Sequence, residues 1–358
     1  MRLYEDVTSH RKHSVLPAEL QRSLVRLCDG IRASRIDRYE LTAVISSLSR
    51  LPADTYLQAA REIVDIGELY RWHEPKRFLL RIVHSQSDYA LLSKTPGLEY
   101  LYLFHGNGYL RERALAKIDG PLKSAFYFNS IAYRLNDWVE PVRQAALACA
   151  TRVFPQTSAA VIAEAAFVLL ERMRHWQRGA KEALILEETF SRPDVVAQLA
   201  ALIKTATTGS PSRVLTNVLR RDQMDAYLLD LSRAALQPSV RAVALSCLIQ
   251  GYAVWPDGFR REWIDKSMGH FRRVIAYQQR ELSHKAPVAS LIAQGAADKA
   301  AMVRRVAADG LVQYRKTLSN LDELVSIFAQ DKSALVRERA VFILREGAEG
   351  QSGAGTRD

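Results

Sequence analysis

The chain has 358 residues, of which 48% are hydrophobic and 25% charged, and this is enough apolar sequence to bury a continuous core. The composition excludes a chain that is mainly disordered, and 50 Lys and Arg against 39 Asp and Glu give a formal net charge of +11. The positive charge favours an acidic partner such as nucleic acid, an anionic membrane surface or an acidic protein, without choosing among them.

The N-terminal segment MRLYEDVTSHRKH is charged and lacks the apolar run of a signal peptide. The most apolar stretch, residues 159–170, is too short to span a bilayer and contains Glu164. The three cysteines, Cys28, Cys149 and Cys247, are too widely spaced to suggest a metal-ligand cluster or a disulfide framework. We therefore expect a soluble, cytoplasmic protein with no membrane span.

One short pattern recurs along the chain: Val or Leu, then Arg, then Ala three residues after the Arg. Its five clear copies, in chain order, contain Arg111, Arg143, Arg241, Arg304 and Arg337. Their spacings are 32 (143 − 111), 98 (241 − 143), 63 (304 − 241) and 33 (337 − 304) residues. We interpret the two long intervals as about three and two steps of one period. Weaker copies are predicted at Arg38, Arg77, Arg213 and Arg272.

The repeated unit is predicted to be helical. Apolar residues recur at helical intervals around each copy, as in Val336, Ala340 and Ile343, and turn signals separate the copies. Such self-similarity is typical of an α-solenoid, in which each helical pair buries its apolar face against the next. We predict an all-α, right-handed α-solenoid of roughly nine helical pairs that forms a single domain over 1–346. The repeats are clearest over 105–150 and 236–346 and irregular over 155–235, and a disordered tail is expected at 347–358.

Three of the copies resemble the second helix of HEAT repeats: DWVEPVRQAAL, DKAAMVRRVAA and DKSALVRERAV. The resemblance is specific over 298–346 and is limited to the rhythm in much of the rest. The period is shorter than that of typical HEAT units and is similar to the short HEAT-like repeats of bacterial scaffold proteins and bilin lyase subunits. The resemblance implies a stack of helical pairs that offers a long curved surface to a partner.

An aspartate precedes the arginine by six residues in three copies: Asp137 and Arg143, Asp298 and Arg304, and Asp331 and Arg337. The resemblance to HEAT repeats implies that an aspartate in the inter-helix turn pairs with an arginine of a successive unit, which makes a ladder along the stack. An aspartate just before a helix also caps its free N–H groups and suits its dipole. We therefore interpret these six residues as structural, not as ligand contacts.

The sequence contains no recognisable catalytic constellation. It has no G-x-S-x-G, no G-x-x-x-x-G-K-[ST], no H-E-x-x-H and no dinucleotide fingerprint after a strand. We therefore assign no catalytic, cofactor-binding or metal-binding residue, and expect no cofactor and no small-molecule substrate. The predicted fold is similar to that of alkylpurine DNA glycosylases of the AlkD type, but none of their functional residues matches a position in this chain.

Basic residues cluster between Arg260 and Lys316, where twelve Lys or Arg face five Asp or Glu. The doublets at 272–273 and 304–305 are one period apart, so stacking of helical units would align the second arginine of each on one surface. We name Arg260, Arg261, Arg273 and Arg305 the basic stripe and treat them as candidate binding residues. The alternative is a solvated basic face with no partner, and the sequence does not separate the two.

The function predicted first is therefore a non-catalytic, HEAT-like scaffold or adaptor that binds a macromolecular partner, most simply a protein, on its curved surface. The alternative is a nucleic-acid-binding solenoid that uses the basic stripe within residues 260–316, with a glycosylase activity of the AlkD type as its extension.

Overall fold

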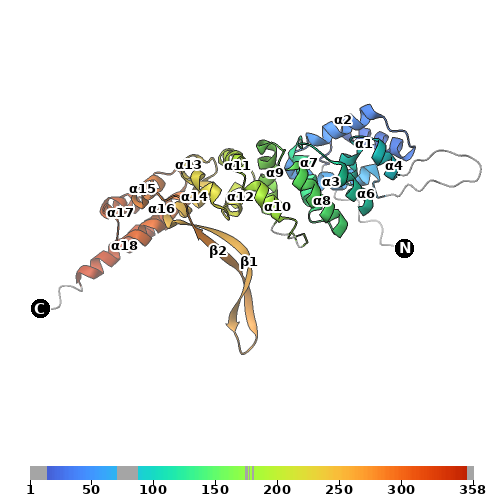
Figure 1. Cartoon of the computed structure of the whole chain (residues 1–358). Helices are drawn as coiled ribbons and strands as arrows, with labels where there is room; N and C mark the ends of the chain where they lie inside the picture. Colours follow the sequence, from blue (N-terminus) through green and yellow to red (C-terminus); the bar gives the residue numbers. More distant parts are fainter. Residues whose placement is uncertain (1–13, 71–87, 174–175, 177, 180, 353–358) are drawn as a thin grey trace, which may run out of the picture. The chain divides into compact units, whose positions relative to one another are not determined.

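The computed structural model describes residues 14–70, 88–173, 176, 178–179 and 181–352, with side chains described through Glu346. Over these residues the protein is mostly helical, with helices numbered to α18 and one two-stranded sheet (Figure 1). The chain divides into two compact units, Met1–Val195 and Val196–Asp358. The single domain over 1–346 stays a prediction. The boundary falls inside helix α11 (Pro193–Thr205), so no linker of distinct composition marks it.

The described helices of the first unit are short. They are α1 (Ala18–Arg32), α2 (Arg38–Ser49), α3 (Tyr56–Gly67), α4 (Asp88–Lys94), α5 (Leu98–Tyr102), α6 (Gly108–Lys117), α7 (Ala125–Arg134), α8 (Glu140–Val153), α9 (Ala159–Arg172) and α10 (Leu184–Phe190), with a 3₁₀ turn at Ala53–Thr55. Helix α6 packs on α8 and α7 packs on α9, so alternate helices of this unit are neighbours. The weak repeat copy at Arg77 lies outside the described residues.

The second unit contains the remaining helices and the sheet. Its elements after α11 are α12 (Pro211–Val218), a 3₁₀ turn (Asp222–Tyr227), α13 (Leu228–Ala234), α14 (Pro238–Gln250), β1 (Tyr252–Asp265), β2 (His270–Glu281), α15 (Val288–Ala296), α16 (Ala301–Tyr314), α17 (Leu321–Ala329) and α18 (Ala334–Ser352). Helices pair as α13 with α14, α15 with α16 and α17 with α18, and α16 packs on both α14 and α18. Successive helical pairs therefore contact one another within this unit.

The recurring apolar positions of the sequence pattern form the contacts between these helices. The Val or Leu and the Ala of each clear copy are four residues apart, which puts them on the same helix face. Both positions are almost fully buried in all five copies: Leu110 and Ala114, Val142 and Ala146, Val240 and Ala244, Val303 and Ala307, and Val336 and Ala340. Small Ala side chains at these positions allow neighbouring helices to approach closely, as they do where α14, α16 and α18 pack.

The predicted repeat copy at Phe271-Arg272-Ile275 is wrong, because these residues lie in a β-strand and not in a helix. Strands β1 and β2 pair in antiparallel fashion from Tyr252 with Glu281 to Asp265 with His270. The turn between them is closed by the Asp265 carboxylate, which accepts hydrogen bonds from the backbone N–H groups of Ser267 and Met268. We call residues 252–281 the hairpin arm.

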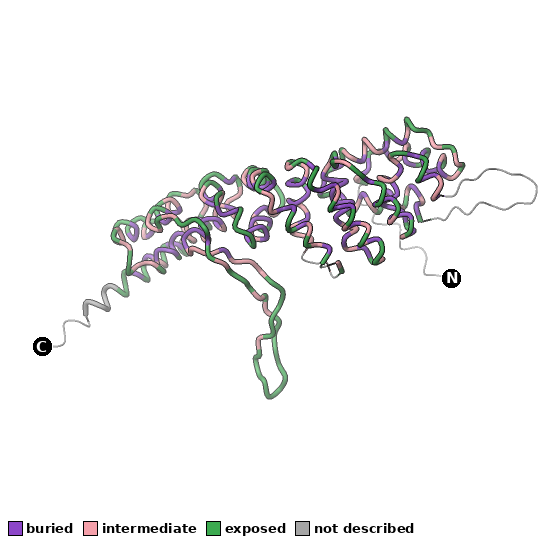
Figure 2. The backbone as a smooth tube through the Cα atoms, viewed as in Figure 1, coloured by how far each residue is buried: buried purple, intermediate pink, exposed green. Residues whose placement is uncertain are grey.

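The hairpin arm is an insertion between α14 and α15 that leaves the helical packing intact. Gly251 ends α14 in the left-handed region at φ +77°, and its carbonyl accepts the Leu282 N–H, so the chain returns to its starting point. The long interval between Arg241 and Arg304 is therefore one helical period plus the arm, not two periods. Figure 1 shows the arm projecting from the helices of its unit, and Figure 2 shows that most of its length is exposed.

The C-terminal helix extends further than the sequence suggested, and the cysteines are buried. Helix α18 continues to Ser352, past the start of the tail expected at residue 347.

Cys28, Cys149 and Cys247 are free thiols, and burial raises the pKa of the first two to about 12 and that of Cys247 to about 11. Among the helices that the structure describes, none combines the length and hydrophobicity needed to cross a bilayer.

Candidate functional site

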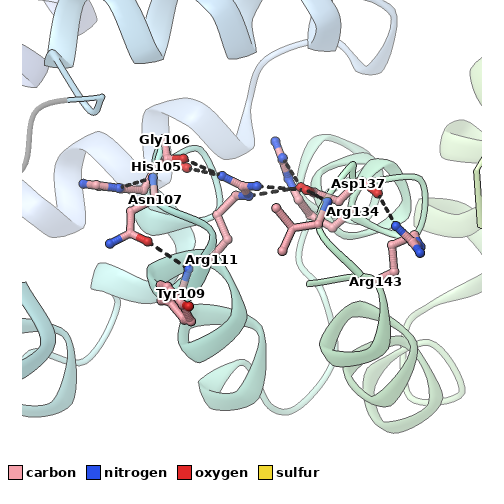
Figure 3. A network of polar contacts seen from close by, with 9 residues as sticks. His105, Gly106, Asn107, Tyr109, Arg111, Arg134, Asp137 and Arg143 are labelled. Atoms are coloured by element: carbon pink, nitrogen blue, oxygen red, sulfur yellow. Dashed lines mark hydrogen bonds and ion pairs between the residues drawn. The ribbon is translucent and has the colours of Figure 1, made fainter. Parts of the chain in front are cut away.

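Three arginines of the repeat pattern join successive helical pairs through one recurring contact. In the first unit, Arg111 on α6 donates from Nε and Nη2 to the two carboxylate oxygens of Asp137, at 3.0 and 2.8 Å. Its Nη1 donates to the carbonyls of His105 and Gly106 in the turn before its own helix, at 2.8 and 3.0 Å (Figure 3). The guanidinium group thus joins the turn before α6 to the turn between α7 and α8.

The same geometry occurs twice in the second unit. Arg241 donates to both carboxylate oxygens of Asp298, and Arg304 donates to both oxygens of Asp331, at 2.6 to 3.0 Å. We call these three arginine–aspartate pairs rungs, and their partners are 26, 57 and 27 positions apart in the sequence. The second separation exceeds the third by 57 − 27 = 30 residues, which is the length of the hairpin arm. The contact therefore joins neighbouring helical pairs of the second unit even where the whole hairpin arm is inserted between them.

The arginine that follows each of these aspartates contacts a backbone carbonyl instead of the carboxylate. Arg143, Arg304 and Arg337 each donate from Nη1 to the carbonyl of the aspartate six residues earlier, at 2.7 to 2.9 Å. The carboxylate partners Arg111 and Arg241 were absent from the six residues that the sequence indicated. Their signal was present, since both belong to clear copies of the pattern, but it did not show which arginine meets which carboxylate.

The aspartates also differ from simple helix caps. Each accepts the backbone N–H two residues ahead, of Val139, Ala300 or Ser333, and so closes the turn that precedes the helix. Burial by itself raises the pKa of Asp137, but hydrogen bonds from Arg111 and Val139 and the charge of Arg134 outweigh it and leave that pKa below its usual value. The Asp137 carboxylate is completely inaccessible to solvent and that of Asp331 is 8% exposed. These side chains are occupied within the fold and are not available to a ligand.

The basic stripe is divided by the structure into two places. Arg260, Arg261 and Arg273 lie on the hairpin arm, whereas Arg305 lies on helix α16. The expected equivalence of the doublets at 272–273 and 304–305 is wrong, because the first lies in a strand and the second in a helix. The arm therefore brings three of the four candidate residues together on one element.

The base of the hairpin arm is fixed to the helices by a buried ion pair. Arg280 on β2 donates to both oxygens of Asp225, at 2.9 and 2.6 Å, and also to the carbonyls of Leu219 and Arg221. The Asp225 carboxylate is inaccessible to solvent and also accepts the N–H and hydroxyl of Ser283. The base of the arm is thus joined to the helices by several charged hydrogen bonds.

One face of the arm carries rings and arginines in alternation. The strand register pairs Phe259 with Ile275, Arg261 with Arg273 and Trp263 with Phe271, and side chains of paired residues lie on the same face. We call this the aromatic face; it consists of Phe259, Arg261, Trp263, Phe271, Arg273, Ile275 and Tyr277. Its apolar side chains are 41 to 64% exposed to solvent, so the helices of this unit do not cover them.

The charges on the aromatic face are of one sign. Arg261 lies directly opposite Arg273, an arrangement that destabilises a strand pair through repulsion. Each guanidinium lies over a ring on the opposite strand, Arg261 at 4.8 Å from the centroid of Phe271 and Arg273 at 4.9 Å from that of Phe259. The acid nearest in sequence, Glu262, pairs with Arg272 on the other face at 2.5 Å, and that hydrogen bond lowers the Glu262 pKa.

The described residues contain no group of three or more His, Cys, Asp or Glu side chains that could hold a metal ion. Arginine, tryptophan and tyrosine often dominate the binding energy at protein interfaces, and arginine and aromatic side chains contact the phosphates and bases of nucleic acids. The arm therefore has the composition of a contact surface. Comparison with models of known protein families finds no match to this chain, and comparison with curated proteins finds none either.

Proposed function

We propose that this chain is a non-catalytic nucleic-acid-binding protein whose contact element is the hairpin arm. The observation that carries the proposal is the pair of directly opposed arginines, Arg261 and Arg273, on an exposed face without a carboxylate. A fold gains nothing from this repulsion, whereas a phosphate backbone laid across the face would neutralise both charges and release counterions. None of the residues that make up this face is acidic, so the proposal is one of binding and not of base excision.

We further propose that the helical units form a HEAT-like α-solenoid that holds the arm. The repeated contact between arginine and aspartate, together with the buried Val or Leu and Ala positions, supports this arrangement. In such an array each unit contacts its neighbours only, and an insertion between two units projects from the stack without disturbing it. The arm between α14 and α15 is an insertion of this kind.

The proposal is tested by measuring binding of labelled nucleic acid at a series of salt concentrations. Each phosphate that the protein neutralises adds about 0.9 to the slope of log affinity against log salt on duplex DNA, and about 0.7 on a single strand. We expect the double variant R261E/R273E to lose binding. The separate variant R305E serves as control, because Arg305 lies on α16 and its loss should change affinity little.

Melting curves of both variants should match that of the wild type, since the substituted side chains lie on the arm or on the surface of α16 and not in the helical core. If the wild-type protein fails to bind either single-stranded or duplex nucleic acid at low salt, the proposal is wrong. Equal loss of affinity in R305E and in R261E/R273E would also contradict it, because the binding surface would then not be the arm.

A second candidate function, an adaptor that docks on a protein, is supported by the exposed apolar side chains at the far end of the arm. Ile264 and Met268 are 70 and 67% exposed and carry no charge to attract phosphate. Methionine and aromatic residues are enriched at protein interfaces. An arm that binds no nucleic acid, but whose deletion abolishes capture of one defined acidic protein, would favour this candidate.

A further inference from the structure

Resting on the proposed function, we infer that the ligand of the aromatic face is a single-stranded nucleic acid whose unstacked bases lie against the exposed rings while its phosphates meet Arg261 and Arg273. A ribbon of two strands can also enter the major groove of duplex DNA, where arginines read base edges. The arrangement of this face favours the single strand for three reasons.

The first reason is the spacing of the rings. Phe259 and Trp263 are four residues apart on β1, which is about 13 Å along an extended strand. Neighbouring bases within a duplex strand are stacked about 3.4 Å apart and cover one another's faces. Two rings this far apart can each stack on a base only where the bases are separated from their neighbours. A single-stranded nucleic acid allows this separation at little cost.

The second reason is the arrangement of two exposed rings, whose planes are steeply inclined to each other. Trp263 and Phe271 meet edge to face, with centroids 5.5 Å apart and planes at 69°. This contact leaves each ring partly uncovered, at 45% and 41% exposed. Insertion of such rings between stacked base pairs would require unstacking of the duplex, which is unfavourable at every step.

The third reason is the position of the guanidinium groups. Arg261 and Arg273 lie over Phe271 and Phe259, so their charges are held close to the sheet and not extended away from it. Reading a base edge at the floor of a groove requires an extended arginine, whereas a strand lying on the face would bring its phosphates to the guanidinium groups directly. A cation held between ring and phosphate is favoured by both neighbours.

The test compares three labelled probes of one mixed sequence of about 15 nucleotides: single-stranded DNA, single-stranded RNA and the blunt DNA duplex. The full chain is titrated into each, and binding is followed by fluorescence anisotropy at low salt. We expect both single strands to bind more tightly than the duplex. The single strands also separate RNA from DNA, since a preference for one would locate contacts to the 2′-hydroxyl.

Two matched pairs of variants distinguish stacking from charge. The stacking variant W263L keeps an apolar side chain but removes the ring, and we expect single-strand affinity to fall about fivefold to 150-fold, as for the loss of one stacked base. Its control V274A shortens an apolar side chain on the opposite face of the arm, where Val274 pairs with Arg260 in the regular part of the ladder. The control should bind as the wild type does.

The charge variant R261A/R273A is compared with R260A/R272A, which removes the same charge from the opposite face of the same two strands. We expect the first to weaken single-strand binding far more than the second. All four proteins should share the wild-type melting curve, because their helical units are unchanged.

Failure of the inference is distinguishable from failure of the proposed function. Tighter binding of the duplex than of either single strand, or equal effects of W263L and V274A, would overturn the inference and leave nucleic-acid binding in place. Absence of binding to all three probes would overturn both, and would leave an acidic protein surface as the partner of the arm.

Discussion

Loss of the buried arginine of the first rung, in the variant R111A, is expected to destabilise the first unit by about 3 kcal/mol. The side chain of Arg111 is 4% exposed and that of Asp137 is not exposed at all. Removing one partner of a buried ion pair costs about 3 to 5 kcal/mol, because the other charge is left without compensation. The lower end applies here, since Arg134 still donates to Asp137 at 2.7 Å.

The rate at which each buried cysteine is chemically labelled measures the stability of the unit that contains it. Cys149 lies on α8 in the first unit and Cys247 on α14 in the second, and both thiols are buried. If labelling requires opening of the unit, a loss of about 3 kcal/mol accelerates modification of Cys149 by about 150-fold. The rate at Cys247 should stay at its wild-type value, and the two are read separately by mass spectrometry of the labelled peptides.

The matched control is R337A, which changes the arginine of the last copy of the repeat pattern and belongs to none of the three arginine–carboxylate pairs. Arg337 is exposed and, within the described residues, donates to the backbone carbonyls of Asp331 and Lys332 and to no side chain, so its loss should cost well under about 1 kcal/mol. Its effect is read as a change in melting temperature of the second unit. A variant R111A whose Cys149 is labelled at the wild-type rate would refute the reasoning, because the buried rung would then contribute no more than an exposed contact.

The Asp137 carboxylate makes the stability of the first unit depend on pH, and Gly295 fixes the approach of two helices in the second. Asp137 has a lowered pKa in the folded protein, so its contribution to stability is present above its usual pKa of 3.8 and is lost as pH falls through the folded value. Thermal melts should therefore show D137N much less stable than wild type at pH 7, with a gap that narrows below about pH 4; a constant gap would contradict this. Gly295 on α15 has no room for a methyl group, because a Cβ there would lie 2.6 Å from Ala307 and from Leu245. We expect G295A to destabilise the second unit by about 1 to 3 kcal/mol, seen as faster labelling of Cys247; a wild-type rate would show that α15 can shift without cost.

Local signals made the helical part of the fold predictable. A helix with buried residues at positions i and i+4 carries its packing face in its own sequence, so Val303 and Ala307 could be assigned to the core from the repeat pattern alone. The repetition of that signal also identified the three aspartates, but of their three carboxylate partners it assigned only Arg304 to the ladder. The identity of each pair could not be read, because Arg241 meets Asp298 across an insertion that the period does not reveal.

The hairpin arm was missed for a physical reason. A strand that covers a core alternates apolar and polar residues, but both faces of this ribbon meet solvent over most of its length. The selection that produces alternation is therefore absent, and the arginine doublet that begins at Arg272 was interpreted as a helical copy instead. A signal did exist: the doubled interval between two clear copies and the β-forming side chains Trp263, Phe271 and Ile275.

The sequence by itself thus determined the helical units, their buried faces and the residue types that join them, because helix periodicity and turn chemistry act over a few residues. Only the tertiary structure decided which charges meet and which remain exposed. Strand register between β1 and β2 sets Arg261 against Arg273 and gathers the rings on one face, and no local pattern encodes a register between two exposed strands. The candidate binding surface exists because of that pairing, whereas its residues are separated along the chain.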